Sequence, residues 1–243
     1  MLRPLRPLAL AALLLAQSAS AQNAPPVAAK QADAVAAAAA AAEDASKRLD
    51  AVLADLAKSL GAVKTLRCRF EQRKYLPVFE EVVVSEGTLA LAVPDKLRWE
   101  YVKPLRSVLT VNGRQTMRER TSRRGVTTRT TASLDDDPVT QVTVQQVFLW
   151  VRGDFAKARE SHELALVSEK PLVVRATPKE ARLKQVIASV ELTFSDDRKR
   201  LSGVTLAEKG AARTEIRYLD AEIDRDLPAS LFEIRSAASG TGK

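Results

Sequence analysis

Residues 65–72 read Thr-Leu-Arg-Cys-Arg-Phe-Glu-Gln, a stretch in which apolar and polar side chains alternate. Leu66, Cys68 and Phe70 fall on one face of an extended chain, and the charged side chains between them fall on the other. The stretch therefore predicts a β-strand with one buried face and one solvated face. Because Cys68 lies on the apolar face, we expect it to be a small core residue and not a reactive thiol.

The same alternation recurs along most of the chain. Asn112-Gly113 is typical of a hairpin turn, and Gly87 predicts a bend inside a longer strand. The further strands are expected over residues 81–93, 97–101, 107–112, 115–121, 126–132, 163–167, 172–176, 185–194, 201–208 and 214–219. Short strands joined by hairpin spacings predict a mainly β fold, a single curved antiparallel sheet or barrel of ten or eleven strands.

A helical period replaces the alternation in the middle of the chain. The acidic run 135–137 and Pro138 offer an N-cap and a first residue for a helix over residues 139–152. A calcium loop needs a different spacing of acidic side chains, so we interpret the run as a helix start. Residues 147–151 are apolar on every side, so the helix must bury a second face in protein or in a ligand.

The N-terminal region predicts export followed by a linker. Two arginines precede an apolar run at residues 8–16, and Ala19-Ser20-Ala21 satisfies the small-residue rule for cleavage. Residues 1–21 are therefore expected to be a signal peptide, cleaved after Ala21. The alanine-rich residues 22–46 have side chains too small to pack a core, so we interpret them as a linker.

The folded domain is expected over residues 47–235. It opens with a helix whose apolar side chains recur at spacings of three and four between residues 49 and 60, before Gly61 as its cap. A short piece at residues 227–232 closes the domain, and residues 236–243 form a polar tail.

Composition leaves little room for catalysis. The chain holds one cysteine and one histidine, too few for a disulfide or a structural zinc site, so no metal and no cofactor is expected. His162 lies in a polar run and is interpreted as a solvated loop or strand-edge residue. No glycine-rich phosphate loop and no nucleophile motif occurs, so an enzyme is not expected.

Charge is mildly positive. Of 38 basic side chains, loss of Arg3 and Arg6 with the signal peptide leaves 36 against 30 acidic ones, a balance that does not predict nucleic-acid binding. One expected hairpin is strongly basic, and it is either a solvated tip or a docking surface for an acidic partner or anionic lipid; its arginines are Arg118, Arg120, Arg123, Arg124 and Arg129. We expect a monomer.

Several of these segments resemble, in order and spacing, the periplasmic lipoprotein carrier family LolA. They are Leu66–Gln72, Glu86–Leu89, Val93–Tyr101 with Pro104, and Val111–Gly113, within a likeness that runs from about Arg48 to Phe232. The resemblance implies a LolA/LolB-like fold, an incomplete, half-open antiparallel β-barrel of about 11 strands with an α-helical lid. It further implies that the protein is periplasmic and that a hydrophobic cavity in the barrel shields the acyl chains of lipoproteins. It also implies a LolCDE-like inner-membrane transporter that loads the cargo and a LolB-like outer-membrane acceptor.

No cysteine follows the predicted cleavage site to receive a lipid, so the resemblance favours the carrier over the anchored acceptor. The resemblance, extended by strand and helix periodicity, predicts a set of apolar residues that line the cavity or form its lid. They are Leu66, Phe70, Leu89, Leu91, Leu97, Trp99, Tyr101, Leu109, Val111, Met117, Val144, Val147, Phe148, Trp150 and Val151.

One position departs from the family pattern. The resemblance implies an arginine just before the proline, which latches the lid and meets the transporter, but Val93 stands here, and Leu97 stands in place of an aromatic residue. The sequence therefore leaves three functions open. They are a lipoprotein carrier, a carrier of a glycolipid or other exported amphiphile, and a half-barrel sensor or scaffold that binds a protein.

Overall fold

A single antiparallel sheet dominates the computed structural model, which describes residues 26–77 and 81–235. The expected signal peptide and polar tail lie outside the described residues. Within these, the strands are β1 (Thr65–Tyr75), β2 (Val83–Ala92), β3 (Lys96–Lys103), β4 (Ser107–Asn112), β5 (Gln115–Thr121), β6 (Thr127–Ser133), β7 (His162–Glu169), β8 (Leu172–Pro178), β9 (Ile187–Phe194), β10 (Leu201–Glu208) and β11 (Arg213–Ile223).

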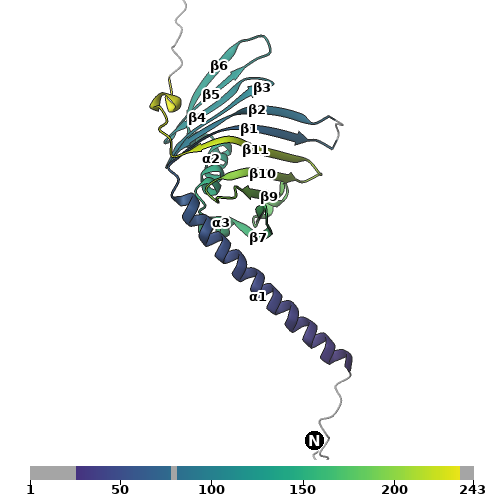
Figure 1. The fold of residues 1–243 in the computed structure, drawn as a ribbon. Helices are drawn as coiled ribbons and strands as arrows, with labels where there is room; N and C mark the ends of the chain where they lie inside the picture. The colour runs from purple at the N-terminus through teal and green to yellow at the C-terminus, as the bar shows by residue number, and fades with distance from the viewer. Residues whose placement is uncertain (1–25, 78–80, 236–243) are drawn as a thin grey trace, which may run out of the picture. The chain divides into compact units, whose positions relative to one another are not determined.

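The strand order confirms the mainly β, half-open fold. It runs β6-β5-β4-β3-β2-β1-β11-β10-β9-β8-β7, so nine of the ten neighbouring pairs are consecutive in the sequence and the tenth joins β1 to β11. The outer strands β6 and β7 do not pair with each other in this order, which leaves the barrel open. Figure 1 shows the sheet curving around one helix, α2.

The helices are α1 (Pro26–Gly61), α2 (Pro138–Val151), α3 (Phe155–Ser161) and α4 (Ala181–Lys184), with short 3₁₀ turns η1 (Leu134–Asp136) and η2 (Ala229–Phe232). The described part of the alanine-rich stretch is helical, continuous with the helix expected at residues 49–60. Helices α3 and α4 were not predicted, because a segment of seven or four residues is too short to display a helical period.

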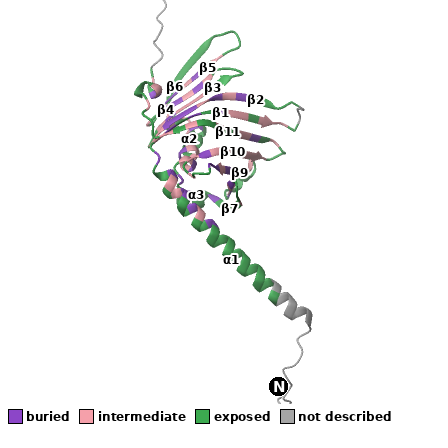
Figure 2. Ribbon diagram, in the orientation of Figure 1, coloured by how far each residue is buried: buried purple, intermediate pink, exposed green. Residues whose placement is uncertain are grey.

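The chain divides into two units, residues 1–44 and 45–243, and the sheet belongs to the second. Along α1, side chains described between residues 35 and 48 are exposed, and Leu49 is the first buried one. Figure 2 shows the same change in colour along the helix.

Two apolar clusters hold the second unit together. One joins the last turns of α1, at Leu53, Leu56 and Leu60, to strands β8 to β10 and to helix α3. The other joins strands β1 to β4 to helix α2 through Val144 and Phe148. Gly153 ends α2 with a φ of 64°, and a Cβ there would meet Leu60 Cδ1 at 3.0 Å, so the α2–α3 turn needs glycine to pack on α1.

Candidate functional site

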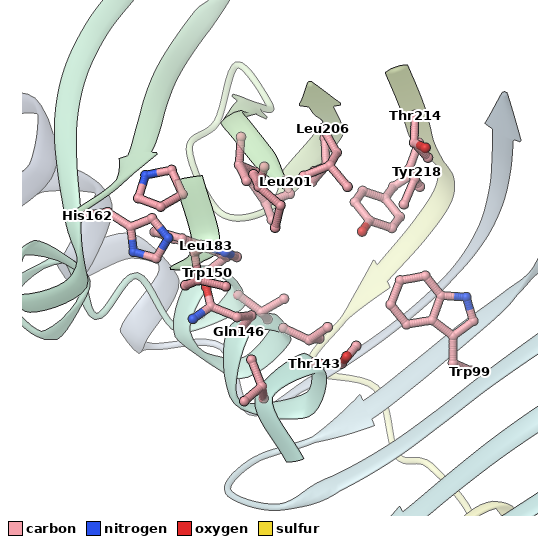
Figure 3. Close-up of a pocket in the computed structure, with 18 residues that line it drawn as sticks. Trp99, Thr143, Gln146, Trp150, His162, Leu183, Leu201, Leu206, Thr214 and Tyr218 are labelled. Carbon is pink, nitrogen blue, oxygen red and sulfur yellow. The ribbon is translucent and has the colours of Figure 1, made fainter. Parts of the chain in front are cut away.

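An apolar cavity of about 320 Å³ lies between helix α2 and the C-terminal strands of the sheet. Figure 3 shows its side chains converging from both sides. The helices contribute Val142, Thr143, Gln146, Val147, Trp150, Val151 and Leu183; the strands contribute Trp99, His162, Pro178, Ile187, Val190, Leu201, Val204, Leu206, Thr214, Ile216 and Tyr218. Its volume and apolar lining fit a small apolar ligand.

Strand register explains why one wall is continuous. Residues directly opposite each other in antiparallel strands point to the same face. Ile216 pairs with Val204, and Leu206 pairs with Val190, so these side chains form one surface across β11, β10 and β9. In the described part of the chain, no other side chains pack fully over this surface, and its residues are only partly buried. The surface therefore forms a wall of the apolar cavity.

Trp99, at the end of the cavity opposite His162, belongs to a group of three aromatic rings (Figure 3). The Phe70 ring meets Trp99 edge-on at 5.6 Å between centroids and Tyr101 at 5.1 Å. The Tyr101 hydroxyl donates a hydrogen bond to Gln72 Oε1 at 2.9 Å. Burial raises the pKa of Tyr101 and of Tyr218, so both phenols stay protonated and the wall stays uncharged.

Helix α2 begins as the sequence predicts. The Asp137 side chain accepts a hydrogen bond from the Thr140 backbone N–H at 3.0 Å, and Pro138 is the first helical residue. Hydrogen bonds from Thr140 hold the pKa of Asp137 below its usual value. Arg118 of β5 donates to Thr140 Oγ1 at 2.5 Å and to Asp137 Oδ2 at 3.4 Å, which ties the helix to the sheet.

The basic hairpin is only partly solvated. Arg118 is used by α2, and Arg129 donates to Glu119 Oε1 at 2.9 Å from Nε. No ion pair is recorded for Arg120, Arg123 or Arg124 with the described residues. For these three arginines, a solvated hairpin tip and a docking surface for an acidic partner or anionic lipid both remain open.

His162 departs from its expected place. It is the first residue of the edge strand β7, but its side chain is buried, with a residue exposure of 4%. Its ring lies 5.3 Å from that of Trp150, edge to face, and Nδ1 lies 2.9 Å from Ser161 Oγ. Burial, helped by nearby Lys179, lowers the pKa of His162. The expectation of a solvated histidine was wrong, because the fold of α2 over β7 covers a residue whose sequence neighbours are polar.

A second cavity of about 520 Å³ adjoins the first and has a more polar lining, although apolar atoms still make up most of it. Both are lined by Val142, Gln146 and Leu183, so these side chains lie between the two spaces. The charged residues around the second cavity are Asp95, Arg152, Asp154, Lys157, Glu160 and Glu180. An amphiphile would therefore meet apolar walls on one side of Gln146 and ionic ones on the other.

The expected cavity residues divide between the open space and the core. Trp99, Val147, Trp150 and Val151 line the apolar cavity, whereas Val111, Val144 and Phe148 line the second one. The others are core residues or pack against the core around β1 to β4: Leu66, Phe70, Leu89, Leu91, Leu97, Tyr101 and Leu109.

Met117 is on the wrong side of the sheet. It pairs with Thr110, whereas Val111, which faces α2, pairs with Thr116. Adjacent residues of a strand point to opposite faces, so Met117 faces away from the helix. After Thr116, the next residue of β5 on the face toward α2 is Arg118, which donates a hydrogen bond to Thr140 of the helix.

Sequence reasoning missed most of the cavity wall. Ile187, Val190, Val204, Leu206 and Ile216 were recognised only as strand residues, although the alternation that selected Leu66 and Phe70 is present in their strands too. Periodicity identifies a shared face, but it does not tell a filled part of that face from an open one.

Other reactive groups are few. Cys68 is buried, as expected, and burial raises its pKa to about 12, which keeps the thiol protonated and unreactive. Within residues 26–77 and 81–235, no three His, Cys, Asp or Glu side chains gather as a metal ion would require. None of the helices in the same residues combines the length and apolar character needed to cross a membrane.

The sequence profile of the family described as outer membrane lipoprotein carrier protein LolA matches residues 61–235. That span covers the whole sheet, helix α2 and the cavity they enclose. The chain belongs to the LolA family. The LolA resemblance inferred from the strand motifs is thereby confirmed.

The individual proteins and solved structures that this chain resembles are distant in sequence. A protein of Pseudoalteromonas translucida (strain TAC 125), named outer-membrane lipoprotein carrier protein, is 22% identical over 179 residues, 73% of this chain and 80% of its own. A LolA superfamily protein from Nitrosomonas europaea is 13% identical, with coverage of 76% and 97% and a TM-score of 0.39. A chain of the Pseudomonas aeruginosa MucA/MucB complex is 14% identical, with a TM-score of 0.45. The match covers 79% of this chain and 61% of that one, less than two thirds.

Proposed function

We propose that the protein is a periplasmic carrier that shields the acyl chains of lipoproteins between the inner and the outer membrane. The observation that carries this proposal is the apolar cavity between α2 and strands β9 to β11, in a chain of the LolA family. A signal peptide cleaved after Ala21, a LolCDE-like loading transporter and a LolB-like acceptor belong to the same proposal.

The physics of such a carrier needs no catalysis. Each methylene removed from water gains about 0.8 kcal/mol, so an acyl chain enters an apolar cavity without strong polar recognition. Release then requires only that the acceptor offers a more favourable apolar environment and that the cavity opens. The tie from Arg118 to α2 is the polar contact that such an opening would break.

A carrier of another amphiphile is the second candidate, and Val93 favours it. Val93 packs against the apolar cluster beneath α2, where the family resemblance implies a charged latch. The lid is therefore held by apolar contacts and Arg118. The arginine that the resemblance implies at this position also meets the transporter. Its replacement by Val93 therefore fits a different loading transporter and a different cargo.

Binding is tested with tryptophan fluorescence. The chain has two tryptophans, Trp99 and Trp150, and both line the cavity. A synthetic diacylated lipopeptide with bromine-labelled chains should quench them saturably in the full mature chain. Ile216→Glu, which places a charge in the wall, should abolish quenching.

Leu219→Glu is the matched control. Leu219 is on the same strand, three residues further on, and is 39% exposed. This variant should bind as the wild type does. Absence of saturable quenching in the wild type would contradict the proposal.

Cargo identity is tested by native mass spectrometry of the protein purified without detergent from its own cells. Co-purifying lipopeptide supports the lipoprotein carrier, and a glycolipid or other lipid supports the second candidate. A protein partner with an empty cavity contradicts both.

A further inference from the structure

The imidazole of His162 is a polar group set into an apolar part of the cavity wall. The residue is 4% exposed, and the Trp150 ring meets it at 5.3 Å. Its partner across the β7–β8 ladder is Pro178, which also lines the cavity. Figure 3 shows His162 beside Trp150 at the end of the cavity opposite Trp99. The hydrogen bonds of its two ring nitrogens decide what a ligand would meet there.

The hydrogen bonds of Ser161 and of the Ala158 carbonyl favour a proton on Nδ1 of His162. The Ser161 hydroxyl donates to the Ala158 carbonyl at 3.4 Å, and the same oxygen lies 2.9 Å from His162 Nδ1. With its proton directed to the carbonyl, Ser161 Oγ accepts a hydrogen bond from Nδ1–H. A neutral imidazole has one N–H, so Nε2 is left as an acceptor with a free lone pair.

Nε2 opens onto the cavity. Among the residues that the structure describes, the ring is hydrogen-bonded to Ser161 Oγ, through Nδ1, and to the Ala158 backbone carbonyl. His162 lines the cavity, and Figure 3 shows its ring turned toward Trp150. A buried acceptor without a partner costs free energy until a donor reaches it.

We propose that His162 Nε2 accepts a hydrogen bond from an amide N–H at the polar end of the cargo. The cavity would then prefer acyl chains joined through a secondary amide to those joined through an ester. This inference rests on the proposed function of acyl carriage. An ester offers only acceptor atoms, so it leaves Nε2 unpaired. The Gln146 carboxamide, which borders both cavities, offers donors to the carbonyl oxygen of either ligand.

The test uses two ligands that differ by N–H against O: N-methyldodecanamide and methyl dodecanoate. Their affinities for the full mature chain are measured by displacement of a bromine-labelled acyl ester that quenches Trp99 and Trp150. The amide-to-ester affinity ratio in the wild type should exceed that in His162→Phe about tenfold. The phenyl ring keeps the contact with Trp150, so the comparison isolates the acceptor.

Two further measurements separate hydrogen bonding from packing. His162→Gln restores an acceptor and should recover part of the preference. N,N-dimethyldodecanamide lacks the N–H and should lose the advantage of the monomethyl amide in the wild type, a comparison that needs no variant to fold.

An equal amide-to-ester ratio in the wild type and in His162→Phe, with both ligands bound, would overturn the inference and leave the carrier function intact. Failure of the wild type to bind either ligand would overturn the carrier function itself.

Discussion

Gly87 allows the aromatic end of the cavity to form. A Cβ at this position would lie 2.1 Å from the Glu100 carbonyl oxygen and 2.5 Å from Phe70 Cζ. The Phe70 ring occupies that space and meets Trp99 and Tyr101 from there. The bend expected at Gly87 is present as a register shift between β2 and β3. Lack of a side chain, and not a positive φ, is what the position requires.

Gly87→Ala should therefore destabilise the protein by about 1–3 kcal/mol, because the new methyl group displaces the Phe70 ring or the β3 backbone. Urea unfolding measures the change. Gly61→Ala is the control, since its Cβ would meet only the Arg152 carbonyl oxygen at 3.9 Å and should leave stability nearly unchanged. Equal stability of the two variants would contradict the packing argument.

His162 predicts a pH dependence of stability. Its pKa is lowered by burial from the ordinary value of 6.5, so below pH 6.5 the unfolded chain binds more protons than the folded chain. The free energy of unfolding should fall as the pH falls from 6.5 through the folded-state pKa, and this contribution should be constant above 6.5.

Urea unfolding of the wild type and of His162→Phe at pH 8, 7, 6 and 5 measures this effect. His162 is the single histidine of the chain, so the difference between the two plots of unfolding free energy against pH isolates its contribution. The wild type should lose more stability on acidification. Parallel curves would show that the imidazole is as solvated as the polar sequence around it suggests.

At the scale of the element, two different kinds of contact hold α2, the proposed lid, against the sheet. Val144 and Phe148 pack into the apolar cluster, while Arg118 binds the N-terminal turn of the helix. Phe148 is a core residue at 9% exposure, so a charge there would unfold the lid and would not simply empty the cavity. The polar tie is the contact that can be removed while the core stays intact.

Arg118→Met should speed release of a bound acyl probe about fivefold, since loss of a partly exposed, charged hydrogen bond costs about 1 kcal/mol. Stopped-flow fluorescence gives the dissociation rate. Arg120→Met, on the same strand, should release the probe at the wild-type rate. An unchanged rate in Arg118→Met would mean that α2 does not move during release.

At the scale of the whole molecule, we expect the first turns of α1 to be separable from the folded domain. Described side chains between residues 35 and 42 are exposed, and the apolar cluster begins at Leu49. The domain boundary expected near residue 46 stays a prediction. Deletion of residues 22–42 from the mature chain tests it.

The shortened chain should keep its free energy of unfolding within about 0.5 kcal/mol and its affinity for the brominated lipopeptide. Urea unfolding and fluorescence quenching measure both. Loss of stability would place this part of α1 inside the domain, and loss of binding alone would give it a part in holding cargo.

Strand positions could be predicted because alternation is a local property. The expected segments 107–112 and 115–121 coincide with β4 and β5, and the N-cap of α2 is at Asp137. The fold class follows from the same local patterns added along the chain. Helix α3, of seven residues, has too little sequence to show a period.

The sequence by itself determined the strands and the helix that begins after Asp137, because each depends on residues close together in the chain. The LolA resemblance supplied the half-open sheet, whose central pair, β1 with β11, joins the two ends of the folded domain. Only the tertiary structure decided where the cavity lies. Leu97 and Ile216 each lie on a strand with alternating apolar residues, yet α2 fills the space over one and leaves it open over the other. Register placed Met117 on the far face, and the packing of α2 over β7 buried His162, because both depend on contacts between residues far apart in the sequence.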